Sequence, residues 1–176
     1  MESWRLVWRD GFSPLLSSER LRRLLDILRR DDPKLTQGST TTPPPLMCVA
    51  DWPCEAGCAL VCSFCEWGET TVGEGEAEFA RLCFEADQRI GEPAACRWFL
   101  NWFDDCPRNE MRTELISEVE LELSKRGESV IPLDPALVKA WESDHSPALR
   151  SAISDWFRER GDSLAADAWA AGKELL

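Results

Sequence analysis

Hydrophobic residues recur with a helical period along most of this chain. Between residues 18 and 30 one apolar stripe faces a row of arginines, and it consists of Leu21, Leu24, Leu25 and Leu28. Two later segments have the same period, one at Phe79, Leu82, Cys83, Ala86 and Ile90, the other at Met111, Leu115, Val119 and Leu123. This spacing predicts amphipathic helices that each turn one face toward a core.

Capping residues predict where these helices begin and end. Ser17 or Ser18 can cap the first helix, and Thr71 with Glu74 has the spacing of a capping box for the helix that runs to about Ile90. Gly127 is a typical C-terminal stop for the helix after Pro107. The stretch KLTQGSTTTPPPL, residues 34–46, cannot continue a helix and predicts an extended loop.

Two further helices are predicted in the middle of the chain. Pro53 suits the first position of a helix that carries four cysteines to residue 65. The segment from Pro93 to residue 104 is apolar on almost every side, which predicts a central, buried helix.

The C-terminal part predicts a smaller helical region. Helices are expected to start at Asp134-Pro135, at Ser146-Pro147 and near Ser163, beyond a linker at 128–133. We therefore predict an all-α fold, with an N-terminal helical body over 1–127 and a small C-terminal helical module over 134–176. No two segments have the pattern of a β-hairpin.

The charge balance limits the possible partners. The chain has 20 basic and 32 acidic residues, a net charge of −12 with its single histidine neutral. This argues against a protein that follows nucleic-acid phosphates and against binding to an anionic membrane. A protein partner with a basic surface fits this balance, although an acidic surface can also serve solubility alone.

Two groups of residues are candidates for contact with such a partner. The first is the acidic face of the helix after Pro107, with Glu110, Glu114, Glu118 and Glu122. The second is Trp4 with Trp8, an i, i+4 pair that either packs on the core or faces a partner.

The N-terminus lacks the pattern of a secretory signal, and no stretch reaches the roughly 18 apolar residues of a membrane span. We therefore expect a cytoplasmic protein whose eight cysteines are mostly reduced.

The most unusual segment is CEAGCALVCSFC, residues 54–65. On one helix Cys54, Cys58, Cys62 and Cys65 would fall within an arc of about 80°. Free cysteine packs like a small hydrophobic residue, so this stripe predicts a core-facing surface and no cofactor.

A metal site is the alternative for the same cysteines. One straight helix would spread the four thiols over about 16 Å, too far for a single ion. Two neighbours such as Cys58 and Cys62 could still hold zinc or an iron–sulfur cluster, completed by Cys83, Cys96 or Cys106 from other helices. A long-range disulfide from Cys48, Cys83, Cys96 or Cys106 would need oxidation.

Signatures of catalysis are weak. The spacing of Cys58, Cys62 and Cys65 resembles the cluster-binding loop of radical S-adenosylmethionine enzymes, but that family needs a large α/β barrel and only 111 residues follow Cys65. His145 is the only histidine that could assist a nucleophilic cysteine, and phosphate-binding motifs are absent. The sequence therefore favours a non-catalytic interaction protein, followed by a metal-binding module and then a thiol redox sensor or enzyme.

The C-terminal segment SPALRSAISDWFRERGD resembles a short helical repeat-companion domain of planctomycete bacteria. Asp155, Trp156, Arg160, Gly161 and Asp162 match its pattern, whereas Phe157 and Arg158 depart from the usual Leu and Glu. DWPCEAGCAL and ACRWFLNWF are similar to uncharacterised proteins of such bacteria. The resemblance implies an accessory helical module and carries over no catalytic residue.

Overall fold

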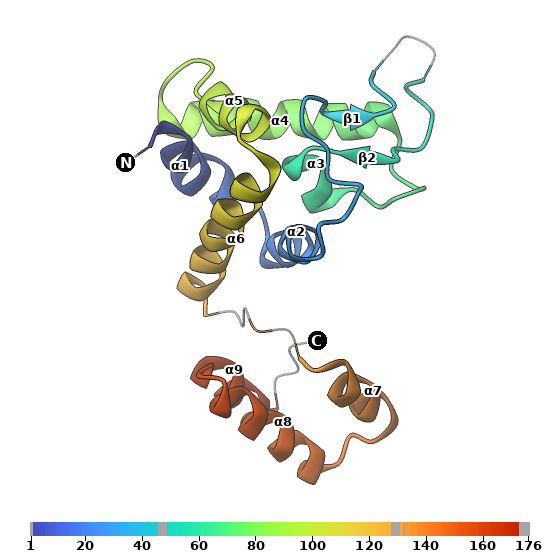
Figure 1. The fold of residues 1–176 in the computed structure, drawn as a ribbon, viewed down its shortest axis with the longest axis vertical. Helices are drawn as coiled ribbons and strands as arrows, with labels where there is room; N and C mark the ends of the chain where they lie inside the picture. Colours follow the sequence, from blue (N-terminus) through green and yellow to red (C-terminus); the bar gives the residue numbers. More distant parts are fainter. Residues whose placement is uncertain (1, 46–48, 128–130, 132, 173–176) are drawn as a thin grey trace. The chain divides into compact units, whose positions relative to one another are not determined.

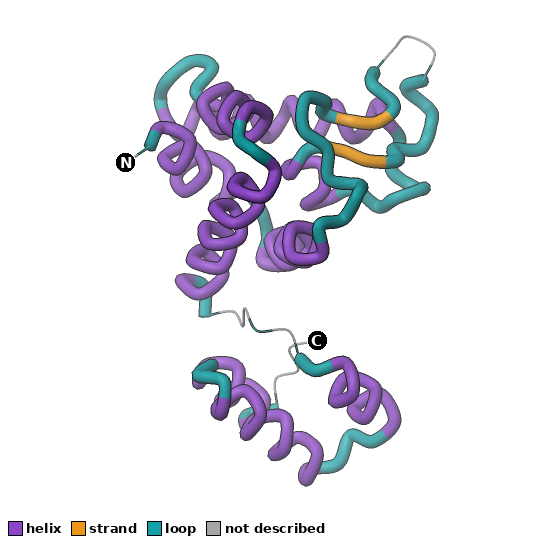
Figure 2. The backbone as a smooth tube through the Cα atoms, viewed as in Figure 1, coloured by secondary structure: helices purple, strands orange, loops and turns teal. Residues whose placement is uncertain are grey.

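The computed structural model describes residues 2–45, 49–127, 131 and 133–172. It divides into two compact units, residues 1–122 and 123–176, and helices dominate both (Figures 1 and 2). The all-α prediction is confirmed, with one small antiparallel sheet added: Thr41–Thr42 (β1) pairs with Ala56–Gly57 (β2).

The N-terminal unit contains most of the helices. They are α1 (Ser3–Leu6), the π-helical η1 (Val7–Phe12), the 3-10 turn η2 (Ser13–Leu15), α2 (Ser18–Arg30), α3 (Ala59–Phe64), α4 (Val72–Ile90) and α5 (Cys96–Asp105). The long α6 (Arg108–Lys125) begins in this unit and its last turn belongs to the C-terminal unit.

The predicted caps are present. The hydroxyl of Ser17 accepts a hydrogen bond from the backbone N–H of Arg20, and Thr71 forms the full capping box with Glu74. At the other end of α4, Gly91 has φ 78°, a left-handed conformation that glycine adopts at little cost. Local sequence chemistry thus sets the ends of α2 and α4.

The N-terminal segment forms part of the core. The indole of Trp4 stacks on that of Trp102 with ring centroids 3.5 Å apart, and Trp8 and Phe12 both pack against Phe99. Trp4 is only 4% exposed and Trp8 is fully buried. The prediction that these two tryptophans face a partner is therefore wrong, and their alternative role in core packing is correct.

The predicted central helix is buried on one side only. α5 buries Cys96, Phe99 and Phe103, whereas Trp98 is 41% exposed. The reason is that α5 lies at the surface of the N-terminal unit. One face of α5 packs against α1, η1 and α4, and its other face is exposed to solvent.

The predicted helix from Pro53 is wrong in its first part. Residues 53–57 are extended, because Ala56–Gly57 pairs with Thr41–Thr42. Gly57 has no room for a side chain: a Cβ there would lie 2.5 Å from Cγ1 of Val61 and 2.9 Å from the carbonyl oxygen of Thr40. The sheet and the close approach of α3 therefore depend on glycine at this position.

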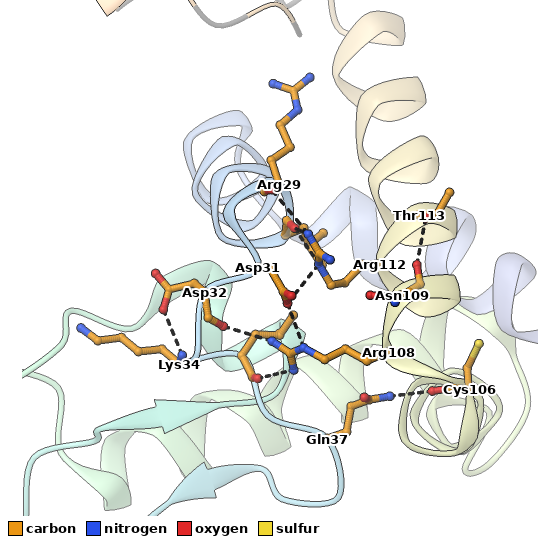
Figure 3. A network of polar contacts seen from close by, with 12 residues as sticks. Arg29, Asp31, Asp32, Lys34, Gln37, Cys106, Arg108, Asn109, Arg112 and Thr113 are labelled. Carbon is orange, nitrogen blue, oxygen red and sulfur yellow. Dashed lines mark hydrogen bonds and ion pairs between the residues drawn. The ribbon is translucent and has the colours of Figure 1, made fainter.

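Two arginines of α6 bind the C-terminal end of α2 (Figure 3). The guanidinium of Arg112 donates to the carbonyl oxygen of Leu28 at 2.8 and 2.9 Å. Arg108 donates to the carboxylate of Asp31 at 2.8 Å and to the carbonyl oxygen of Leu35 at 2.8 Å. The last carbonyls of a helix lack α-helical partners, and Arg112 donates to one of them. Arg108 binds the residues that follow α2, so the two arginines together fix the end of α2 against α6.

The C-terminal unit has its own core. α7 (Pro135–Ser143), α8 (Pro147–Glu159) and α9 (Ser163–Ala170) enclose one apolar cluster, which consists of Trp141, Ile153, Phe157, Ala165, Ala166 and Trp169. The caps predicted at Asp134 and Ser146 are confirmed. Most of the predicted linker at 128–133 lies outside the described residues.

Replacing Arg112 by methionine keeps much of the apolar side chain and removes the hydrogen bonds to the carbonyl of Leu28. We expect the free energy of unfolding of the N-terminal unit to fall by about 1–3 kcal/mol, measured by urea denaturation. Arg97→Met, at an exposed position of α5, is the matched control and should change it by less than about 0.5 kcal/mol. Equal effects of the two variants would contradict this role of Arg112.

Candidate functional site: buried thiols and an acidic hollow

Four cysteines surround the short helix α3, and we call Cys54, Cys58, Cys62 and Cys65 the thiol quartet. Cys54 precedes β2, Cys58 is the N-cap of α3, Cys62 lies within it and Cys65 is its C-cap. All four are buried, with at most 5% of each residue exposed. The prediction that they pack in the core is confirmed. They do not share one helix, however, because Cys54 lies in a loop, Cys58 and Cys65 cap α3, and only Cys62 lies within it.

Backbone hydrogen bonds hold this segment in place. The N–H of Cys54 donates to the carbonyl oxygen of Thr70 at 2.8 Å, and the N–H of Thr70 donates to that of Glu66 at 2.8 Å. The resulting turn brings Cys65 beside Cys54, whose thiol donates to the carbonyl oxygen of Ala56 at 3.3 Å. The Cys62 thiol donates to the carbonyl oxygen of Gly57 at 3.3 Å.

Burial keeps Cys58, Cys62 and Cys65 uncharged. It raises the pKa of Cys58 to about 12 and that of Cys65 to about 12, and it raises the pKa of Cys62 as well. The thiolate is the nucleophilic form, and almost none is present near neutral pH. These three thiols therefore lack the thiolate that a catalytic cysteine needs.

The same four cysteines are the candidate ligands of the predicted metal site. The Cys62 thiol lies near those of Cys54, Cys58 and Cys65. Among the described residues, however, no three His, Cys, Asp or Glu side chains are arranged to hold one ion. A metal would therefore need some of these side chains to rotate or shift toward one another.

A second pair of thiols lies between α4 and α5. Burial and the nearby Cys96 thiol raise the pKa of Cys83, and burial together with the Asp87 carboxylate raises the pKa of Cys96. Sequence analysis named both cysteines only as possible distant ligands or disulfide partners. Their proximity depends on the turn between the two helices, which a periodic pattern does not encode.

Much of the predicted acidic face on α6 is used inside the protein. Glu118 is 5% exposed and receives two hydrogen bonds from Arg9, at 2.6 and 2.7 Å. Glu114 accepts one from Arg5 at 2.6 Å. The prediction that Glu114 and Glu118 are free to bind a partner is therefore wrong, because they hold the N-terminal segment. Glu110 is exposed and Glu122 is half-buried.

Sequence analysis missed these ion pairs, although a signal was present. Arg5 and Arg9 are four residues apart, and so are Glu114 and Glu118. Residues four apart lie on the same face of a helix. When the two helices lie side by side, each arginine of the first pair can therefore face one glutamate of the second.

An acidic hollow lies where the turn after α3 meets the start of α4. It has a volume of about 370 Å³ and is lined by Phe64, Glu66, Glu69, Thr70, Glu74 and Glu78. Hydrogen bonds from Arg81 and Arg20 lower the pKa of Glu78 to about 2, so this carboxyl is anionic at neutral pH. No described residue forms an ion pair with Glu69. The hollow can therefore accept a further cation.

His145 belongs to the C-terminal unit, which contains no cysteine. It is exposed, and its ring lies 4.7 Å from that of Trp141. Its position gives no support to a Cys–His catalytic pair.

Comparison with protein-family models, curated proteins and solved structures found no match. Within the described part of the chain, no helix has both the length and the apolar character to span a bilayer.

The raised thiol pKa values predict how stability depends on pH. A thiol whose pKa is higher in the folded state stabilises that state fully below the unfolded pKa, and this contribution is lost as pH rises through the folded pKa. The free energy of unfolding should therefore fall between about pH 9 and pH 12, by up to about 1.4 kcal/mol per pH unit for each such thiol. Urea denaturation at a series of pH values measures this.

Cys58→Ala removes one of these groups and should make that decline shallower. Cys106→Ala, at a half-buried position outside the quartet, should alter it less. A decline that is identical in all three proteins would contradict the assignment to buried thiols.

Proposed function

We propose that this chain is a non-catalytic helical interaction protein whose N-terminal unit binds a basic segment of a protein partner through the acidic hollow. The chain would act in the cytoplasm, where its thiols stay reduced. The observation that carries this proposal is the concentration of unbalanced negative charge around α3 and α4.

Charge is unevenly distributed along the chain. No lysine or arginine occurs between Lys34 and Arg81, and residues 51–92 contain ten acidic side chains against two basic ones. This segment accounts for a net −8 of the total −12. By contrast, the carboxylates of α6 that face the N-terminal segment are neutralised by Arg5 and Arg9. The hollow is therefore the part of this unit best suited to attract a cation.

The hollow already holds one cationic side chain of the protein itself. The guanidinium of Arg20 lies over the ring of Phe64, 5.4 Å from its centroid, and donates to Glu78 at 2.7 Å. An aromatic face flanked by carboxylates is a favourable environment for arginine or lysine. Glu69 provides an exposed carboxylate for a similar contact with a partner, and the exposed Glu66, which pairs with Arg23 at 2.9 Å, lies beside it in the lining of the hollow.

The test is titration calorimetry of the full chain with a synthetic arginine- and lysine-rich peptide. Replacing Glu66 and Glu69 together by glutamine should weaken binding roughly three- to tenfold, since each exposed ion pair contributes up to about 1 kcal/mol. Binding should also weaken as salt increases.

A matched control keeps the change in net charge constant. Glu142→Gln with Glu159→Gln alters two exposed positions of the C-terminal unit and should leave the affinity nearly unchanged. If both double variants bind the peptide equally well, the peptide is attracted only by the net charge of the chain, and the acidic hollow is not its binding site.

A metal-binding module is the second candidate, because the Cys62 thiol lies near the other three thiols of the quartet. It predicts about one zinc ion, or an iron–sulfur cluster, per chain after anaerobic purification without an affinity metal. Elemental analysis and assay of acid-labile sulfide measure this. The metal should disappear when Cys58 and Cys62 are changed to serine, while Cys106→Ser should retain it. Absence of metal from the unmodified protein would exclude this candidate and leave the quartet as core.

For the C-terminal unit, we propose the role of an accessory helical module that its resemblance implies. The proposal is supported by the helical hairpin of α8 and α9. In it Trp156 packs against the core and Gly161 ends α8 with φ 82°.

A further inference from the structure

The α4–α5 connection places two cysteines near each other without linking them. Cys83 lies in the second half of α4 and Cys96 begins α5. Burial and the neighbouring Cys96 thiol raise the pKa of the Cys83 thiol, so the two thiols lie near each other. Cys83 is half-buried and Cys96 is 9% exposed. This pair is therefore closer to solvent than the thiol quartet.

Asp87 fixes the geometry of this pair. Its carboxylate accepts the backbone N–H of Cys96 at 2.7 Å and that of Ala94 at 2.9 Å. Ala94 has φ 60°, a conformation that residues other than glycine seldom adopt, so these bonds hold a tight and otherwise costly turn. Asp87 lies four residues after Cys83 on α4, which places Cys83 one helical turn away on the same face.

We propose that Cys83 and Cys96 form an oxidisable dithiol that a peroxide converts into a disulfide bridging α4 and α5. This inference stands independently of the proposed acidic docking site. It assigns a modification site to a pair of neighbouring thiols of which one, Cys83, is partly exposed.

The reaction balances in two steps. The sulfur of one cysteine attacks the peroxide, the O–O bond breaks, and a sulfenic acid and one water are produced from hydrogen peroxide. The second cysteine then attacks the sulfenic sulfur, the S–S bond forms and a second water leaves. Two thiols lose two electrons and two protons, and hydrogen peroxide is reduced to two waters.

The residues around Cys83 and Cys96 are compatible with a disulfide but slow its formation. Both the thiol pair and the disulfide are uncharged, so oxidation leaves no ion in this partly buried space. The attacking species is a thiolate, however, and burial together with the carboxylate of Asp87 raises the pKa of Cys96. The other titratable group facing the pair is the Cys58 thiol. Oxidation should therefore be slow near neutral pH and accelerate about tenfold per pH unit below the thiol pKa.

The distribution of arginines makes the product easy to identify. Trypsin cleaves after Arg81, Arg89 and Arg97, so Cys83 and Cys96 fall on the neighbouring peptides 82–89 and 90–97. The quartet and Cys48 share the single peptide 35–81, and Cys106 lies on 98–108. A disulfide between 82–89 and 90–97 is therefore distinct in mass from every other pairing.

The experiment treats the folded, fully reduced chain with hydrogen peroxide, blocks the remaining thiols with an alkylating agent and analyses the unreduced digest by mass spectrometry. We expect the 82–89 and 90–97 peptides to be linked, two hydrogens lighter than their sum. The linkage should increase with pH and should be removed by dithiothreitol. The bridge should also raise the Tm of the N-terminal unit by on the order of 5–10 °C.

Three variants control the result. Cys83→Ser and Cys96→Ser should each abolish the linkage and the rise in Tm, and circular dichroism verifies that they fold. Cys106→Ser should leave both unchanged. Oxidation of Cys106 alone, or a dominant link between peptide 35–81 and peptide 82–89 through Cys58, would overturn the proposal.

Discussion

The N-terminal unit is organised by one physical requirement: a polar or ionisable group removed from water must have a partner or lose its charge. Glu118 is buried as an ion because Arg9 donates two hydrogen bonds to it. The carbonyl oxygen of Leu28 at the end of α2 is satisfied by Arg112. Cys58, Cys62 and Cys65 meet the same requirement differently, since burial raises their pKa and they stay protonated.

This requirement also determines which acidic residues are available for function. Carboxylates that pack between helices are neutralised internally, so the acidic face of α6 contributes mainly to the fold. Around the turn after α3, Arg20 and Arg23 of α2 pair with Glu78 and Glu66, whereas no described residue pairs with Glu69. The surface left for a cationic partner is therefore set by where the internal ion pairs are formed.

Local signals predicted much of the fold, and tertiary contacts explain most of the failures. The cap at Ser17, the capping box at Thr71 and the helix starting at Ser146-Pro147 are encoded within a few residues, and each is confirmed. The helix predicted from Pro53 was wrong because residues 56–57 pair with residues 41–42, across the intervening loop. Burial of the quartet was predictable from composition, whereas the contact between Cys83 and Cys96 depends on a turn held by Asp87.

The central claim, that the quartet consists of buried core thiols, is tested most directly by timed alkylation of the folded protein. A Cys48→Ser variant leaves the quartet as the only thiols on tryptic peptide 35–81, and Cys106 on peptide 98–108 is the internal reference. The account predicts that peptide 35–81 is alkylated at least about a hundredfold more slowly than peptide 98–108 until denaturant is added. Alkylation of both peptides at similar rates in the folded protein would contradict it.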